Sequence, residues 1–206
     1  MKQIILISNP TPVANEGQLI NELFIEGLEV LHLRKPGYDI GSLGELVAAI
    51  LPEYHSRIVW PATFLQDEYW KSRMGKRIHF FEFLRTQIEP ETFRELKNQG
   101  FVLSTSVHEA AAYNALARAF DYTFFSPVFD SISKPGYTAM PVAKLELLKQ
   151  RHSTKIIALG GIQEENCRQA LDYGFDGVAI LGAVWQSAHP VATFKNIQAC
   201  IMSGQS

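Results

Sequence analysis

Eight short apolar segments recur along the chain, and stretches with helical features separate them. The segments are rich in β-branched and aromatic residues, and several are almost continuously apolar rather than alternating. Such runs are typical of strands that are buried on both faces of a parallel sheet. The segments are residues 3–8, 29–33, 56–60, 77–81, 100–104, 121–125, 154–159 and 177–181.

The stretches between these segments indicate helices. Pro90 and Gly100 bracket one helix, since proline is favoured at the start and glycine just past the end. Ser106 and Glu109 have the Ser-x-x-Glu spacing of a capping box, which predicts the start of another. Further helices are expected at residues 16–27, 141–151, 163–173 and 190–202. Ser42 and Glu45 form a second capping box, which predicts a helix start there. Residues 62–74 are ambiguous between helix and loop, although their apolar residues fit one helical face.

Eight strand–helix alternations within 206 residues predict a single (β/α)₈ TIM barrel, an α/β fold that takes up residues 1–206 as one domain. The alternative is a doubly wound open sheet. It is disfavoured because the first strand is followed by SNPTPVANEG rather than by a G-x-G-x-x-G phosphate loop. No linker or low-complexity tract interrupts the order.

Charge and cysteine content restrict the partners of such a barrel. The formal net charge of −2 gives no overall attraction to nucleic acid or to an anionic membrane. The apolar run at 4–7 is too short for a signal peptide, and no later run approaches the length of a membrane span. Cys167 and Cys200 form no disulfide or metal-binding pattern. We expect a cytoplasmic protein without nucleic-acid or membrane partners, and a homodimer is compatible with the sequence.

Glycine turns follow the last two predicted strands. Gly160 and Gly161 end the seventh strand, and Gly182 and Ala183 end the eighth. Glycines let backbone N–H groups approach an oxyanion closely. In TIM barrels, phosphate commonly binds after strands seven and eight, at the carboxyl ends of the strands. The two turns therefore predict a phosphate site.

Cations are expected on the same rim of the barrel. Arg34 and Lys35 end the second strand, and Lys134 follows the sixth in the sequence SISK, with Ser131 and Ser133 beside it. Arginine can form a bidentate contact with phosphate, whereas lysine acts as a mobile point charge. Three cations opposite two glycine turns favour a ligand with two anionic groups.

Histidines within the predicted strands are less informative. His32 lies in the second strand and His79 in the fourth, where an ordinary barrel-lining role is the simpler interpretation. Ser106 would be explained by helix capping alone. No pair of histidines has the spacing of zinc ligands.

Several motifs together make the chain resemble the thiamine phosphate synthase and thiazole tautomerase superfamily of small barrels. The resemblance covers most of the chain and depends on the order and spacing of its parts. The motifs are LHLR (31–34), TSVHEA (105–110), DYTFFSPVFDSISK (121–134), IIALGGI (156–162) and GFDGVAILGAVW (174–185).

The resemblance implies an activity on small phosphorylated heterocycles. Synthases of this superfamily join a hydroxymethylpyrimidine diphosphate to a thiazole phosphate, and they release diphosphate with the help of Mg²⁺ and basic residues. By this resemblance, Arg34, Ser106 and Lys134 would be catalytic. The implied substrate-binding residues are His32, Lys35, Ser131, Ser133, Gly160, Gly161, Gly182 and Ala183.

Two metal-binding positions of the synthases are changed in this chain. Trp60 and Pro61 stand where synthases carry an Asn-Asp pair, and Leu84 stands near a second aspartate. We therefore assign no metal ligands to the protein, and Mg²⁺ would be held through the substrate's diphosphate. The position of a further synthase lysine is Pro36, for which Lys35 could compensate.

These changes leave three hypotheses. A divergent synthase is preferred because Arg34, Ser106 and Lys134 are all present. A tautomerase-like isomerase is supported by His32 and by the missing aspartates, although Pro127 stands where tautomerases carry a catalytic histidine. A catalytically silent relative that binds phosphate ligands for regulation is the third.

Overall fold

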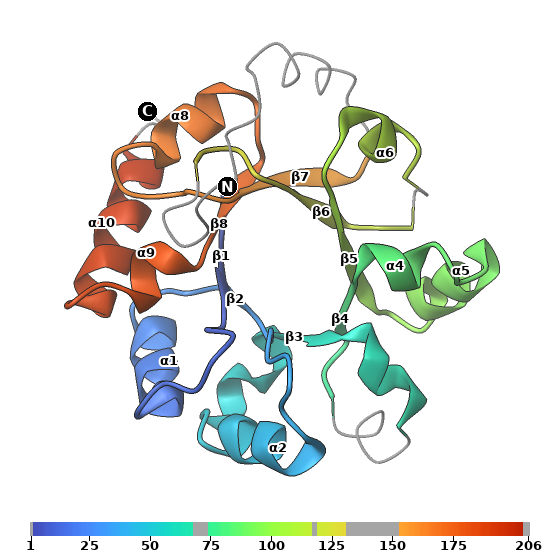
Figure 1. Cartoon of the computed structure of the whole chain (residues 1–206), viewed down its shortest axis with the longest axis horizontal. Helices are drawn as coiled ribbons and strands as arrows, with labels where there is room; N and C mark the ends of the chain where they lie inside the picture. Colours follow the sequence, from blue (N-terminus) through green and yellow to red (C-terminus); the bar gives the residue numbers. More distant parts are fainter. Residues whose placement is uncertain (1, 68–73, 117–118, 131–152, 204–206) are drawn as a thin grey trace.

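The strands of the computed structural model close into a parallel barrel in the order β1 to β8, with β8 pairing back to β1 (Figure 1). The structure describes residues 2–67, 74–116, 119–130 and 153–203. The TIM-barrel fold predicted from the sequence is confirmed. The strands are β1 Gln3–Ile7, β2 Val30–His32, β3 Ile58–Pro61, β4 Arg77–Phe80, β5 Val102–Val107, β6 Tyr122–Phe125, β7 Lys155–Leu159 and β8 Gly177–Ile180.

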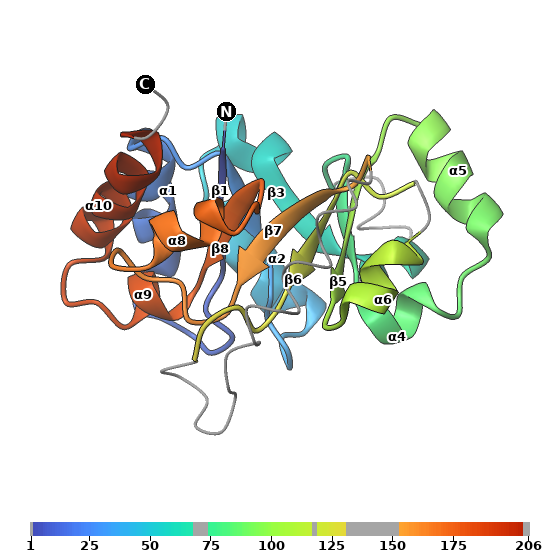
Figure 2. The same cartoon turned by 90° about the horizontal axis from the view of Figure 1, so that it is seen from above.

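Helices surround the barrel in both views (Figures 1 and 2). They are α1 Glu16–Ile25, α2 Ile40–Ala48, α4 Glu82–Arg85, α5 Pro90–Asn98, α6 Ala110–Asn114, α8 Cys167–Asp172, α9 Gly182–Trp185 and α10 Pro190–Met202. Two 3₁₀ turns, η1 Pro52–Arg57 and η2 Ala62–Gln66, flank β3. In the part of the chain that the structure describes, no helix is long and apolar enough to cross a membrane.

Alternation along each strand divides the core into two layers, because successive side chains point to opposite faces of a sheet. The larger layer lies between the strands and the helices and includes Leu6, Leu31 and Phe125. The smaller layer fills the inside of the barrel. Its buried residues are Ile5, Ile7, Val30, Val59, Tyr122, Phe124, Ile157 and Ala179.

Both predicted capping boxes are wrong. Helix α2 begins earlier than expected, with the Asp39 carboxylate accepting a hydrogen bond from the N–H of Ser42 at 2.7 Å. Ser106 lies within β5, and α6 begins at Ala110 without a side-chain cap. The apolar pattern ended β5 too early because polar residues of this strand face the barrel interior. The start of α5 at Pro90 is confirmed, whereas the helix expected at 141–151 lies outside the described residues.

Asp121 connects α5 to the strand pair β5–β6, and its replacement by asparagine is expected to destabilise the barrel by about 1–2 kcal/mol. Its carboxylate accepts two hydrogen bonds of 2.7 Å from Lys97 and one of 2.8 Å from the N–H of Leu103. Urea unfolding would measure the change. The exposed pair Arg94–Glu91 provides the control, since Glu91→Gln should change stability by less than about 0.5 kcal/mol. Equal effects of the two substitutions would contradict a special role for Asp121.

Candidate active site

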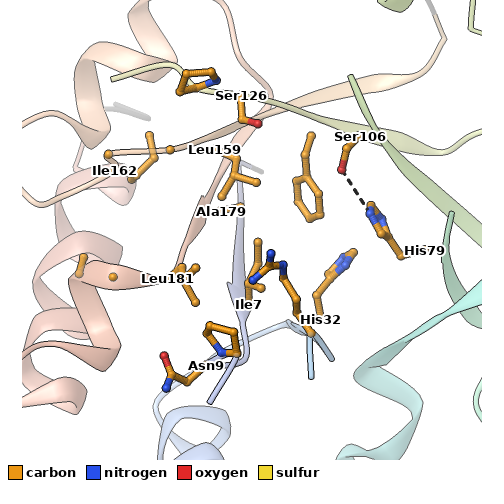
Figure 3. A pocket seen from close by; sticks show the side chains of 18 of the residues that line it. Ile7, Asn9, His32, His79, Ser106, Ser126, Leu159, Ile162, Ala179 and Leu181 are labelled. Atoms are coloured by element: carbon orange, nitrogen blue, oxygen red, sulfur yellow. Dashed lines mark hydrogen bonds between the residues drawn. The ribbon is translucent and has the colours of Figure 1, made fainter. Parts of the chain in front are cut away.

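A cavity of about 640 Å³ opens at the carboxyl ends of the strands. This is the face on which TIM barrels carry their active sites. Its wall combines apolar side chains with polar groups from most of the strand ends (Figure 3). Among the lining residues are Asn9, His32, Arg34, His79, Glu82, Ser106, His108, Phe124, Gly160, Gly161, Gly182, Ala183 and Gln186.

The predicted glycine turns both line this cavity. Among the described residues, the N–H groups of Gly161, Ile162, Gly182 and Ala183 donate no hydrogen bond. Backbone N–H groups that converge on a cavity are suited to bind an anion. The side chain of Asn166 holds the first turn, because its Nδ2 donates to the carbonyl of Gly161 at 2.8 Å. The structure thus provides two backbone turns that could hold a phosphate group.

Gly161 has a structural role beside the predicted one. Its φ of +65° is in the left-handed region, and a Cβ atom there would lie 2.4 Å from the carbonyl oxygen of Asp130. The segment after β6 is hydrogen-bonded alongside, through the N–H of Phe129 to the carbonyl of Gly160 at 3.1 Å. Gly161 is therefore required for packing between the ends of β6 and β7, whether or not a ligand binds.

The predicted cations differ in their surroundings. Arg34 lines the cavity, its N–H donates to the buried Ser8 hydroxyl at 2.8 Å, and its guanidinium has no carboxylate partner among the described residues. Lys35 lies outside the lining, where its Nζ pairs with Glu16 at 2.5 Å. Adjacent residues point in opposite directions, which explains the difference. The predicted phosphate contact of Lys35 stays a prediction.

Three predicted residues cannot be compared with the cavity. Ser131, Ser133 and Lys134 lie outside the described residues, and their assignment stays a prediction. The chain before them is described as far as Asp130.

The two strand histidines meet at the wall of the cavity, where their ring centroids are 5.2 Å apart. His79 Nε2 lies 3.2 Å from the Ser106 hydroxyl, and Figure 3 shows this contact. On the other side of the ring, His79 Nδ1 lies 3.0 Å from Ser104 Oγ. His32 Nε2 lies 2.5 Å from the hydroxyl of Tyr122. Ser106 is therefore held by a histidine rather than used as a helix cap.

Burial keeps both histidines uncharged. It lowers the pKa of His79 from 6.5 to about 3. Burial also lowers the pKa of His32 well below its ordinary value, and a positive charge on His32 is further disfavoured by the nearby His79 and Arg77. Each ring therefore carries one proton at neutral pH, so one nitrogen donates and the other accepts.

The sequence indicates only an ordinary barrel-lining role for His79 and does not point to His108, although both line the cavity. His79 is the last inward-facing residue of β4, as Ser106 is of β5, and this alternation could have found it. His108 Nδ1 donates to the carbonyl of Ser126 at 2.9 Å, which leaves Nε2 for a ligand. Its nearness to β6 could not be deduced from the sequence.

Magnesium does not fit the described residues. The ion prefers octahedral sites with carboxylates and waters as ligands. The lining contains one described carboxylate, Glu82, which lies 3.4 Å from Arg85. Within the described ranges, no group of three His, Cys, Asp or Glu side chains is placed to hold a metal ion.

Fold and cavity together define a (β/α)₈ barrel with a cavity at the carboxyl ends of its strands. The protein-family model described as thiamine monophosphate synthase matches residues 4–184. This match extends over most of the barrel. The chain belongs to the thiamine monophosphate synthase family.

Individual relatives agree with this assignment. A thiamine-phosphate synthase of Methanocella arvoryzae is 34% identical over 112 residues, which are 52% of each chain. One of Anoxybacillus flavithermus is 28% identical over 103 residues, 48% of each chain. The chain thus spans about half the length of the curated relatives it matches.

Solved structures match over the whole length. The crystal structure of a thiamine phosphate pyrophosphorylase from Bacteroides thetaiotaomicron superposes with a TM-score of 0.77, 28% identity and complete coverage of both chains. A thiamine phosphate pyrophosphorylase from Pyrococcus furiosus has a TM-score of 0.74 and 16% identity, with 99% and 97% coverage, and shows the fold alone.

Proposed function

We propose that the protein is a thiamine-phosphate synthase, which joins a hydroxymethylpyrimidine diphosphate to a thiazole phosphate and releases diphosphate. The observation that carries this proposal is that two backbone turns, Arg34 and Ser106 line one and the same cavity. The names of the relatives and the family of the chain support it.

Several described residues of the cavity can bind the two substrates of such a reaction. Arg34 would bind the diphosphate, because a guanidinium offers a planar pair of donors to phosphate oxygens. The Ser106 hydroxyl, held by His79, would donate to the same group or to the heterocycle. The N–H groups at Gly161, Ile162, Gly182 and Ala183 would hold the phosphate of the second substrate.

Departure of diphosphate leaves a pyrimidine cation, and the thiazole nitrogen then forms the new C–N bond. The cavity wall around this step is largely apolar and aromatic, with Phe81 and Phe124 among its residues. Such a wall keeps water from the cation and strengthens the attraction between Arg34 and the leaving group. Lys134 would add a second positive charge, as the sequence predicts.

In this proposal, Mg²⁺ is bound only through the diphosphate group of the substrate. Coupling assays with added Mg²⁺ and with a chelator would show whether turnover needs the ion.

Formation of thiamine phosphate from the two substrates tests the synthase activity itself. Binding of both substrates without product would support a silent ligand-binding relative instead. A cytoplasmic location and a homodimer stay predictions.

The Arg34→Ala variant is expected to bind inorganic pyrophosphate about 10- to 100-fold more weakly, since a charged hydrogen bond is worth about 1.5–3 kcal/mol. Calorimetry would measure the affinity, and thermal melts would show that folding is kept. Arg94→Ala is the matched control, because it removes one positive charge from the exposed surface of α5. Wild-type affinity in Arg34→Ala would exclude this residue from the anion site.

A second candidate function is an isomerase that moves a proton on a phosphorylated heterocycle. Two uncharged histidines within one cavity favour it, because a neutral imidazole can both accept and donate a proton. Incubation with a carboxylated thiazole phosphate would give an isomer in this case and no C–N coupling product.

A further inference from the structure

The two cysteines of the chain, Cys167 and Cys200, meet at one backbone carbonyl. We propose that they form a redox-sensitive site, where a small disulfide compound closes a bridge between α8 and α10 and weakens phosphate binding at the turn of Gly160 and Gly161. No cysteine motif indicates this site, because the two residues lie in different helices. The inference rests on the proposed function only in taking this turn as a phosphate site.

Both thiols contact the carbonyl oxygen of Glu164. The distance to this oxygen is 3.3 Å from Cys167 Sγ and 3.8 Å from Cys200 Sγ. Cys167 is the first residue of α8, and Cys200 lies near the end of α10. The two helices lie side by side in both views (Figures 1 and 2). Since the two sulfur atoms share one acceptor, they are close neighbours, and both thiols are free.

A second contact holds the same two segments together. The carboxylate of Glu164 accepts a hydrogen bond of 2.9 Å from Asn196 Nδ2, one helical turn before Cys200. A thiol is only a weak hydrogen-bond donor, so the sulfurs can leave the carbonyl at small cost. A disulfide needs the sulfurs to approach to about 2.05 Å. Rotation of the two side chains can supply this movement while the Glu164–Asn196 contact keeps the segments together.

The two thiols differ in their access to solvent, which gives each a separate role. Cys200 is half-buried, whereas Cys167 is fully buried. Burial and, in smaller measure, the neighbouring Cys200 thiol raise the pKa of Cys167 to about 12. Because the thiolate is the nucleophile, we expect Cys200 to react with a disulfide from solution. Cys167 would then react with the sulfur of Cys200 beside it.

Oxidation of the pair takes two exchange steps. The Cys200 thiolate attacks one sulfur of the small disulfide, forms a mixed disulfide and expels one thiolate. Cys167 then loses its proton to water, and its sulfur attacks Cys200 Sγ and expels the second thiolate. The two cysteines lose two electrons and two protons, and the small disulfide takes them up as two thiols. Exchange with an excess of thiol reopens the bridge.

A short hydrogen-bonded segment connects Cys167 to the glycine turn. The N–H of Cys167 donates to the carbonyl of Gln163 at 2.9 Å. The side chain of Asn166 accepts from the N–H of Gln163 at 2.8 Å and donates to the carbonyl of Gly161 at 2.8 Å. The bridge would release Cys167 Sγ from Glu164 inside this segment. Since a hydrogen bond weakens as its angle departs from linearity, a small rotation here would impair the N–H donors of the turn.

Thiol counting before and after treatment with oxidised glutathione tests the bridge. The denatured reduced protein should have two free thiols, and the treated protein should have none. The treated protein should also remain monomeric on a non-reducing gel, with the peptides of Cys167 and Cys200 linked in the mass spectrum. Two free thiols after treatment, a lasting glutathione adduct on Cys200, or a disulfide-linked dimer would overturn the bridge.

Amide NMR of the ligand-free protein tests the connection to the turn. Oxidation should shift the signals of Gly161 and Ile162 in wild type. The same treatment should leave both signals in place in Cys200→Ser, which keeps the buried Cys167 and cannot form the bridge. Signals of Gly161 and Ile162 that do not move in oxidised wild type, or that move equally in Cys200→Ser, would contradict the connection.

Titration with inorganic phosphate measures the effect on binding. Oxidised wild type should bind phosphate roughly 3- to 10-fold more weakly than reduced wild type, as expected when one hydrogen bond is impaired. Cys200→Ser should have the same affinity with and without treatment. Equal affinities of oxidised and reduced wild type would overturn the regulation of the turn. Absence of phosphate binding in the reduced protein would count against the proposed function, while the thiol count and the Gly161 signal still decide the bridge and its connection.

Discussion

The Gly161→Ala variant is expected to lose about 3 kcal/mol of stability together with phosphate binding, whereas Gly182→Ala should lose phosphate binding alone. At Gly161, the new Cβ would lie 2.4 Å from a carbonyl oxygen, with φ at +65°. A left-handed backbone costs a residue with a side chain roughly 1–2 kcal/mol, and the clash adds to this. At Gly182, the nearest heavy atom would be Gln186 Oε1 at 3.7 Å, which is ordinary contact distance.

This pair of variants separates packing from binding. Gln186 itself lines the cavity, so the added methyl group at Gly182 would stand where an anion approaches the backbone. Urea unfolding would measure stability, and calorimetry with thiazole phosphate would measure affinity. A Gly182→Ala protein with wild-type affinity would remove the turn after β8 from the phosphate site. A stable Gly161→Ala protein would contradict the packing at the ends of β6 and β7.

Acid is expected to destabilise the protein between pH 6.5 and pH 3 through its buried histidines. Above pH 6.5, His79 is neutral both in the folded and in the unfolded chain. Below that value, the unfolded chain binds a proton, but the folded chain does not until its pKa of about 3. Each such histidine lowers the free energy of unfolding by about 1.4 kcal/mol per pH unit within this window. His32, whose pKa burial also lowers, acts in the same direction.

Comparison of wild type with His79→Gln isolates the effect from the titration of carboxylates. Urea unfolding at pH 7.5, 6.0, 5.0 and 4.5 should give a slope that is less steep in the variant by about 1.4 kcal/mol per pH unit. His189→Gln, which removes an exposed histidine, should follow wild type. Parallel curves for wild type and His79→Gln would mean that His79 is not held neutral by the fold.

All eight strands could be predicted because a parallel barrel buries both faces of each strand, which leaves an apolar run in the sequence. The shared cavity of the turns at Gly160–Gly161 and Gly182–Ala183 and of Arg34 could be predicted, because these residues follow strand ends and the strand ends meet at one face. The prediction was weaker wherever polar residues lie inside a strand. Ser104 and Ser106 looked like the end of β5 and the start of a helix, although both belong to the strand.

The histidine contacts could not be predicted, because they depend on which strands become neighbours and in which register. Tyr122 is 90 positions from His32 in the sequence and bonds to it inside the barrel. Lys35 shows the same limit. It follows Arg34 directly, yet its partner is Glu16 on α1, which no local pattern indicates.

The packing of Gly161 against the segment after β6 also bears on how this barrel could be redesigned. Two walls of the cavity meet there without room for a side chain, so a larger residue in one wall would require the backbone of the other wall to move. Asn9, Phe81 and Gln186 line the same cavity at the ends of other strands and contribute side chains to it. Laboratory evolution toward new heterocycles should therefore accumulate substitutions at such positions and leave the glycine turn unchanged.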